Sequence, residues 1–102
     1  MTRAFVLIDA LPKREKDVFD SLGKVQGVIG RRLLPQRVGQ GDIIVLLEAP
    51  DADGLERLIT NQLRSVPNVH TIIRVLPHAT LLGPVRALMD EMYREVEARG
   101  KA

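Results

Sequence analysis

The residues best suited to bind a small ligand are the consecutive Gly39, Gln40, Gly41 and Asp42, together with Thr71 further along the chain. Two glycines let backbone N–H groups come close to a carboxylate, because no Cβ stands in the way. The carboxylate of Asp42 can pair with an amino group, and the hydroxyl of Thr71 can donate or accept a hydrogen bond. The same residues also suit a plain hairpin turn and a β-branched strand position. Both interpretations, a ligand site and local structure alone, are kept.

The other residues able to do chemistry are isolated from one another. Asp9 interrupts an apolar strand, where it either pairs with an arginine across a subunit interface or marks the exposed end of the strand. The two histidines, His70 and His78, form no HExxH pair, and the chain has no cysteine. The sequence has no specific Ser/His/Asp order, P-loop or carboxylate cluster with metal-ligand spacing. We therefore expect no catalytic residues, no metal site and no cofactor.

The size and composition are those of one globular domain. The chain has 102 residues, of which 45% are hydrophobic and 27% are charged. The absence of cysteine excludes a disulfide scaffold and a cysteine-based zinc site. The longest apolar runs, at residues 4–8 and 43–47, are far shorter than the roughly 20 residues of a membrane span. We expect a cytoplasmic protein that makes no contact with a membrane.

Basic residues are concentrated in the first part of the chain. Residues 1–40 hold eight Lys/Arg and four Asp/Glu, and Arg31, Arg32 and Arg37 lie close together there. This cluster fits phosphate contacts, a solvated surface or an ion pair with Asp9. The chain has no Trp, one Tyr and two Phe, so it lacks the aromatic platform of single-strand binders. We expect no direct binding of nucleic acid.

The spacing of apolar residues predicts an α+β domain of the ferredoxin-like βαββαβ class, with two helices on one face of a four-stranded antiparallel sheet. Pro35 cannot donate to a strand ladder, so the second strand is predicted to be an edge or to carry a bulge. Residues 39–42 are predicted to form the hairpin turn. The expected strands are 3–11, 29–38, 43–49 and 69–76, the expected helices are 13–25 and 51–66, and the domain spans 1–77.

The predicted strands are apolar on both faces, although two helices can cover only one of them. The uncovered face would form a large exposed apolar patch, which favours a homodimer that packs sheet against sheet around a twofold axis. The alternative is cover by the C-terminal extension, residues 78–102. Its segment 81–99 predicts an amphipathic helix whose start Gly83 and Pro84 help to set. Its apolar stripe comprises Leu82, Val85, Met89, Met92 and Val96.

The order of segments AFVLIDAL, GKVQGV, VGQGDIIVLLEAPD, LERLITNQLRSVPNVHT and IIRVL resembles the effector-binding (RAM, ACT-like) domain of the Lrp/AsnC regulators over residues 3–77. Its most specific parts are the Gly-x-x-Asp turn at 39–42 and the Pro-x-Val approach to the threonine-bearing strand at 67–71. The resemblance implies dimers that join through the sheet and assemble into rings. It also implies a small effector, usually an amino acid, bound where dimers meet. The implied site residues are Gly39, Gln40, Gly41, Asp42 and Thr71.

Two features depart from that family pattern. The first strand is predicted to begin at residue 3, so we expect no helix-turn-helix before it, as in the stand-alone members of the family. The last strand often carries Thr-x-Thr in the family, whereas Ile73 takes the place of the second threonine here. The resemblance therefore implies an oligomeric sensor of an amino acid or related metabolite that regulates through partners, such as a DNA-binding relative.

Two other functions stay open at this point. One is a small enzyme that uses a cavity between sheet and helices to act on a hydrophobic or tetrapyrrole-like substrate, since this fold also supports enzymes. The other is an interaction module whose helix at 81–99 docks on another protein.

Overall fold

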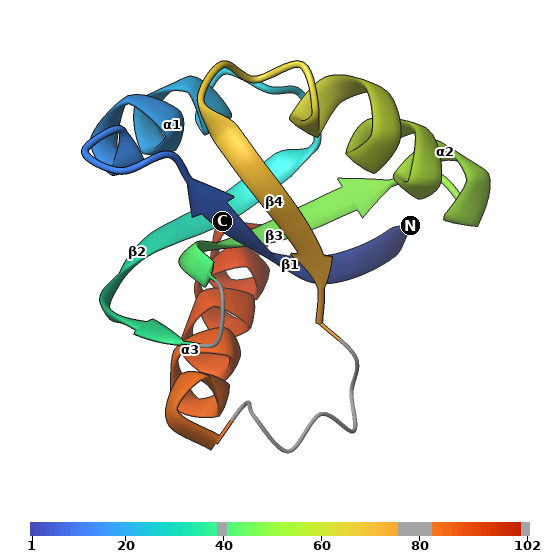
Figure 1. Ribbon diagram of the computed structural model, residues 1–102. Coiled ribbons are helices and arrows are strands. Elements are labelled where there is room, and N and C mark those ends of the chain that lie inside the picture. Colours follow the sequence, from blue (N-terminus) through green and yellow to red (C-terminus); the bar gives the residue numbers. More distant parts are fainter. Residues whose placement is uncertain (39–40, 76–82, 101–102) are drawn as a thin grey trace.

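The computed structural model describes residues 1–38, 41–75 and 83–100, and it places one sheet between two layers of helices (Figure 1). The strands follow the order β2-β3-β1-β4, and all neighbouring strands are antiparallel. This arrangement confirms the ferredoxin-like prediction. The elements are β1 (Thr2–Ala10), α1 (Glu15–Leu22), β2 (Val28–Val38), β3 (Gly41–Ala49), α2 (Ala52–Arg57), η1 (Leu58–Leu63), β4 (Val69–Arg74) and α3 (Gly83–Gly100).

The second strand lies at the edge of the sheet, as Pro35 predicts. The register of β2 against β3 shifts between Val28 and Gly30 and again between Leu33 and Val38. The predicted turn at 39–42 is too long, because Gly41 pairs with Val38 and already belongs to β3. Ladder hydrogen bonds extend the strand into a segment whose composition alone favours a turn.

The helices are shorter than their periodicity predicts. Lys13 has a φ of 68°, which is outside the helical region, so α1 begins at Glu15 and not at 13. The Oδ1 atom of Asp51 accepts a hydrogen bond from the Gly54 N–H at 2.7 Å and so caps α2. The π-helical η1 continues α2 as far as Leu63.

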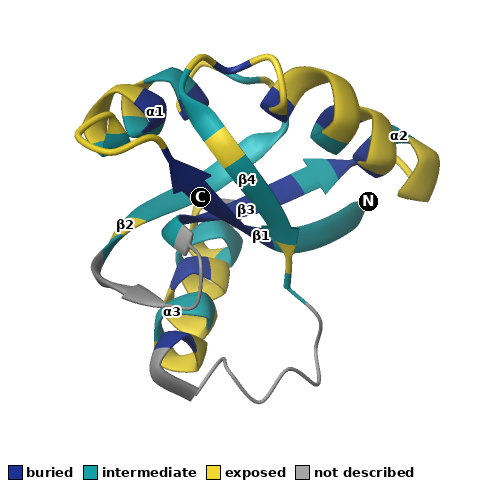
Figure 2. Ribbon diagram, viewed as in Figure 1, coloured by how far each residue is buried: buried dark blue, intermediate teal, exposed yellow. Residues whose placement is uncertain are grey.

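One hydrophobic core fills the space between the sheet and the layer of α1, α2 and η1. It is made by every second residue of the two central strands and by the inner faces of the helices, which Figure 2 shows as buried. The strand residues include Val6, Ile8, Ile43, Val45 and Leu47, and the helix residues include Val18, Leu22, Leu55, Leu58 and Leu63.

A second core lies on the opposite face, where α3 packs against the sheet (Figure 1). Val85 and Met92 of α3 are 1% exposed and meet the buried strand residues Leu7, Ile44 and Leu46. The homodimer prediction assumed that this face of the sheet is uncovered. That assumption is wrong, because α3 covers the face within one chain. Dimerisation itself stays a prediction. None of the described helices is long and apolar enough to cross a membrane.

Candidate functional site

Asp42 and Thr71 lie on either side of Asp9 at one end of the sheet. Asp42 lies in β3 directly before Ile43, whose partner in β1 is Ile8, and its Oδ2 accepts a hydrogen bond from the Ala10 N–H at 3.2 Å. Thr71 of β4 pairs with Asp9 of β1. The register therefore brings three polar residues from three adjacent strands together.

These three side chains share the face that α3 covers. Side chains alternate along a strand, and Asp9, Asp42 and Thr71 each lie two positions from a residue that packs on the α3 side. Asp9 is 5% exposed, whereas Asp42 and Thr71 are half-buried. Two carboxylates beside a hydroxyl form an environment suited to an ammonium group.

Sequence analysis identified Asp42 and Thr71 as site residues, but it treated Asp9 as an isolated charge. The only sign of Asp9 in the sequence is a charge that interrupts an apolar strand. The sequence does not show that Asp9 lies beside Thr71, because that depends on the strand register. The predicted residues Gly39 and Gln40 lie outside the described residues, and Gly41 opens β3. His70 is exposed on β4, and His78 also lies outside the described part of the chain.

A charged cluster occupies the opposite end of the same sheet face. The Nε atom of Arg3 lies 2.7 Å from Oε2 of Glu48, and its guanidinium also pairs with Glu97 of α3. The Cζ atom of Arg3 is 5.0 Å from the ring centroid of Tyr93. The hydrogen bonds that Arg3 donates to Glu48 and Glu97 raise the pKa of Arg3 above its ordinary value. The cluster ties α3 to β1 and β3.

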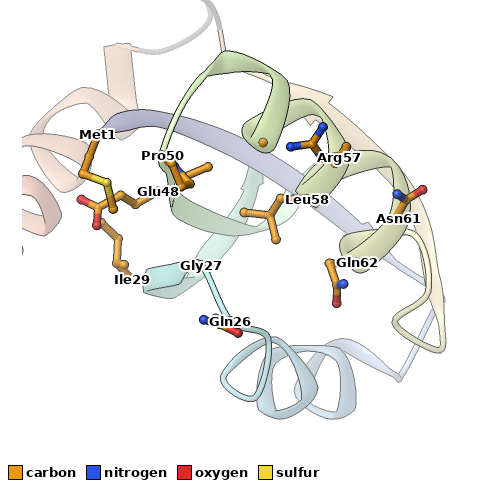
Figure 3. Close-up of a pocket in the computed structure, with 12 residues that line it drawn as sticks. Met1, Gln26, Gly27, Ile29, Glu48, Pro50, Arg57, Leu58, Asn61 and Gln62 are labelled. Atoms are coloured by element: carbon orange, nitrogen blue, oxygen red, sulfur yellow. The ribbon is translucent and has the colours of Figure 1, made fainter.

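A cavity of about 650 Å³ lies between η1, the start of β2 and the end of β3 (Figure 3). Its polar lining includes Gln26, Glu48, Arg57, Asn61 and Gln62, which sequence analysis did not single out. The cavity is at the opposite end of β3 from Asp42, so it is separate from the Asp9–Asp42–Thr71 group. Within the described ranges, no three His, Cys, Asp or Glu residues are grouped so as to hold a metal ion.

No family model and no curated protein matches this sequence. Solved structures do match it. The protein FFRP-DM1 is 24% identical to this chain. The match spans 74% of this chain and 96% of FFRP-DM1, with a TM-score of 0.65. TTHA0845 from Thermus thermophilus is 20% identical to this chain. The match spans 78% of this chain and 95% of TTHA0845, with a TM-score of 0.66.

A third match is the transcriptional regulator NMB0573 from Neisseria meningitidis, solved in complex with L-methionine. It is 21% identical, and 83% of this chain covers 58% of that one at a TM-score of 0.57. Together the matches show that the chain shares its fold with these proteins. FFRP-DM1 and TTHA0845 are matched over nearly their whole length, but each match uses only about three quarters of this chain. Part of this chain therefore has no counterpart in either protein.

Proposed function

We propose that this chain is a regulatory domain of the Lrp/AsnC type that binds an amino acid or a related small metabolite and acts through a partner protein. The observation that carries the proposal is the placement of Asp42 and Thr71 on either side of the buried Asp9, on one face at one end of the sheet. The sequence resemblance over residues 3–77 supports it. So does the shared fold with a regulator solved with L-methionine.

In this proposal the carboxylate of Asp42 pairs with the α-amino group of the ligand, and the hydroxyl of Thr71 supplies a hydrogen bond. The sequence leads us to expect that backbone N–H groups at Gly39 to Gly41, of which 39 and 40 lie outside the described residues, hold the ligand carboxylate. A second copy of the chain meets this end of the sheet and completes the site, as the family resemblance implies. The partner is a DNA-binding relative, and the chain performs no catalytic step.

A thermal-shift screen of the full chain against the twenty amino acids tests the proposal. A ligand at one hundred times its Kd stabilises the folded state by about 2.7 kcal/mol. For a domain of this size, that corresponds to a rise in Tm of roughly 10 °C or more. We expect at least one amino acid to produce a saturable rise.

Two substitutions locate the site. Asp42→Asn keeps an acceptor for the Ala10 N–H but removes the charge, and Thr71→Val keeps the shape but removes the hydroxyl. We expect both to weaken the ligand response, with the larger loss in Asp42→Asn. Asp20→Asn, at an exposed position of α1, is the control and should respond as the wild type does. A screen without any responding amino acid, or an undiminished response in Asp42→Asn, would contradict the proposal.

A further inference from the structure

A separate cavity of about 350 Å³ lies along the outer edge of β2, and arginines from two elements line it. Arg31 and Arg32 are consecutive in β2, so their side chains leave opposite faces of the edge strand, Arg31 toward α1 and Arg32 toward α3. Arg99 comes from the last turn of α3, and the cavity follows the strand edge between these groups. Glu95 is the acidic residue in the described lining. Three arginines against one glutamate give this cavity a formal charge of +2. The proposed amino-acid site does not include any of these residues.

The guanidinium of Arg31 is held in a fixed position. Its Nη1 donates a hydrogen bond to the Phe19 carbonyl at 2.7 Å, and its Cζ lies 4.1 Å from the Phe19 ring centroid. Gly23 is in close contact with the same group, because a Cβ at this position would lie 2.7 Å from Nη2 of Arg31. A planar cation placed between a ring and a glycine is pre-organised for recognition, since little side-chain entropy is left to lose.

The other two arginines are oriented by backbone carbonyls of the edge strand and by Glu95. Arg32 donates to the Arg31 carbonyl at 2.9 Å and pairs with Glu95. Arg99 donates to the Ile29 carbonyl at 3.1 Å. A guanidinium carries more N–H donors than these bonds use. The side chains of Arg32 and Glu95 are 38% and 41% exposed, so a solute can reach them.

We propose that this cavity binds the phosphate group of a small phosphorylated metabolite. Guanidinium forks match phosphate oxygens in bidentate pairs, and the formal charge of the cavity balances that of a phosphate dianion. Phe19, Val28 and Ile29 supply apolar contacts for the organic part of the ligand. The volume lies within the range of small-molecule sites.

The arrangement favours a small ligand over a nucleic acid. A nucleic-acid surface presents an extended basic stripe and stacks bases on exposed aromatics. Here the arginines line one cavity at the strand edge together with Glu95, and the ring of Phe19 is covered by the guanidinium of Arg31. Arg37, the third member of the arginine cluster in the sequence, has its side chain outside the described set.

The test is a titration of the full chain with inorganic phosphate and with glycerol 3-phosphate, followed by thermal shift. Sodium chloride at matched ionic strength is the reference. We expect a saturable rise in Tm that reaches about 5 °C or more when the ligand exceeds its Kd about tenfold. Saturation matters because phosphate also stabilises folded proteins weakly by exclusion from their surface, an effect that does not saturate.

Three substitutions and one control locate the ligand. Arg31→Ala removes the stacked guanidinium, Gly23→Ala displaces it without changing the charge, and Arg99→Ala removes an exposed side chain that the hydrophobic cores do not need. We expect each to raise the Kd at least tenfold. The control is Arg74→Ala, because Arg74 pairs with Glu56 and does not line this cavity. The Tm of each variant is measured with and without ligand. The ligand-induced rise can therefore be compared even where a substitution lowers the starting Tm.

The two probes distinguish the source of the phosphate. Tighter binding of glycerol 3-phosphate supports a phosphorylated metabolite, and equal binding supports the cavity as a site for the free ion. A response that does not saturate would overturn the proposal. So would an undiminished response in both Gly23→Ala and Arg99→Ala. Binding of a short oligonucleotide without a saturable phosphate response would replace it with a nucleic-acid surface.

Discussion

Gly27, which precedes β2, illustrates how a single residue positions the wall of the 650 Å³ cavity. Its φ is 100°, in the region that favours glycine, and its carbonyl accepts a hydrogen bond from the Glu48 N–H at 2.9 Å. A Cβ at this position would lie 2.8 Å from Cδ2 of Leu58. The backbone conformation and the packing of η1 therefore both require a residue without a side chain.

We expect Gly27→Ala to lower the free energy of unfolding by about 2–4 kcal/mol, because the positive φ and the contact with Leu58 each add a cost. Gly30→Ala is the matched control. A Cβ at Gly30 would meet Met92 Cε at an ordinary 3.5 Å, and Gly30 has no positive φ. The control should change stability by less than about 1 kcal/mol. Urea unfolding of both variants measures the difference, and equal effects would contradict the prediction.

Residue type and the family resemblance together made Asp42 and Thr71 candidates, and residue type alone made the arginine cluster one. The grouping of Asp9 with Thr71 and the stacking of Arg31 on Phe19 were not predictable in this way. Each depends on how strands and helices register against one another, and registers follow from the packing of the whole sheet.

At the scale of elements, polar contacts bind the C-terminal half of α3 to the sheet. Glu97 pairs with Arg3 of β1, Glu95 pairs with Arg32 of β2, and Arg99 donates to the backbone of β2. The pKa of Arg3 is raised by the hydrogen bonds that it donates to Glu48, the larger cause, and to Glu97. A cation with a raised folded pKa contributes stability below its unfolded pKa and loses it only as the pH passes the folded pKa. For an arginine, both values lie above ordinary working pH.

We expect Arg3→Ala to lower the free energy of unfolding, and to lower it more than Arg14→Ala does, because it removes two ion pairs and the contact with Tyr93. The loss should be the same at pH 7 and pH 9, since the guanidinium stays charged at both. Arg14→Ala, which removes an exposed pair with Asp17, should cost less than about 0.5 kcal/mol. Thermal and urea unfolding at the two pH values provide the comparison. A loss for Arg3→Ala no larger than for Arg14→Ala would show that this cluster does not anchor α3.

The sequence predicted the type and order of these elements well, and their ends less well. The apolar stripe at Val85, Met89, Met92 and Val96 correctly predicted a helix with one packed face. Periodicity cannot detect the positive φ of Lys13 that delays α1, nor the widened turn of η1, because neither changes the spacing of apolar residues. Leu82, the first member of the predicted stripe, lies outside the described residues.

For the molecule as a whole, the main question is what covers the second face of the sheet. Strands that are apolar on both faces show that this face must be buried, but a second copy and the chain's own helix bury it equally well. The structure places α3 there. A second copy would therefore compete with α3 for Leu7, Ile44 and Leu46, and weakening the attachment of α3 should favour self-association.

Met92→Glu tests this competition, because it places a charge among the buried residues of the second core. We expect α3 to leave the sheet, to become sensitive to limited proteolysis, and to expose a face that drives formation of dimers or larger species. Light scattering after gel filtration measures the mass. Ala87→Glu, at an exposed position of the same helix, should leave mass and protease resistance unchanged. If Met92→Glu matches the wild type in both measurements, α3 does not shield the face. A wild-type dimer that Met92→Glu dissociates would instead place α3 within the contact between two copies.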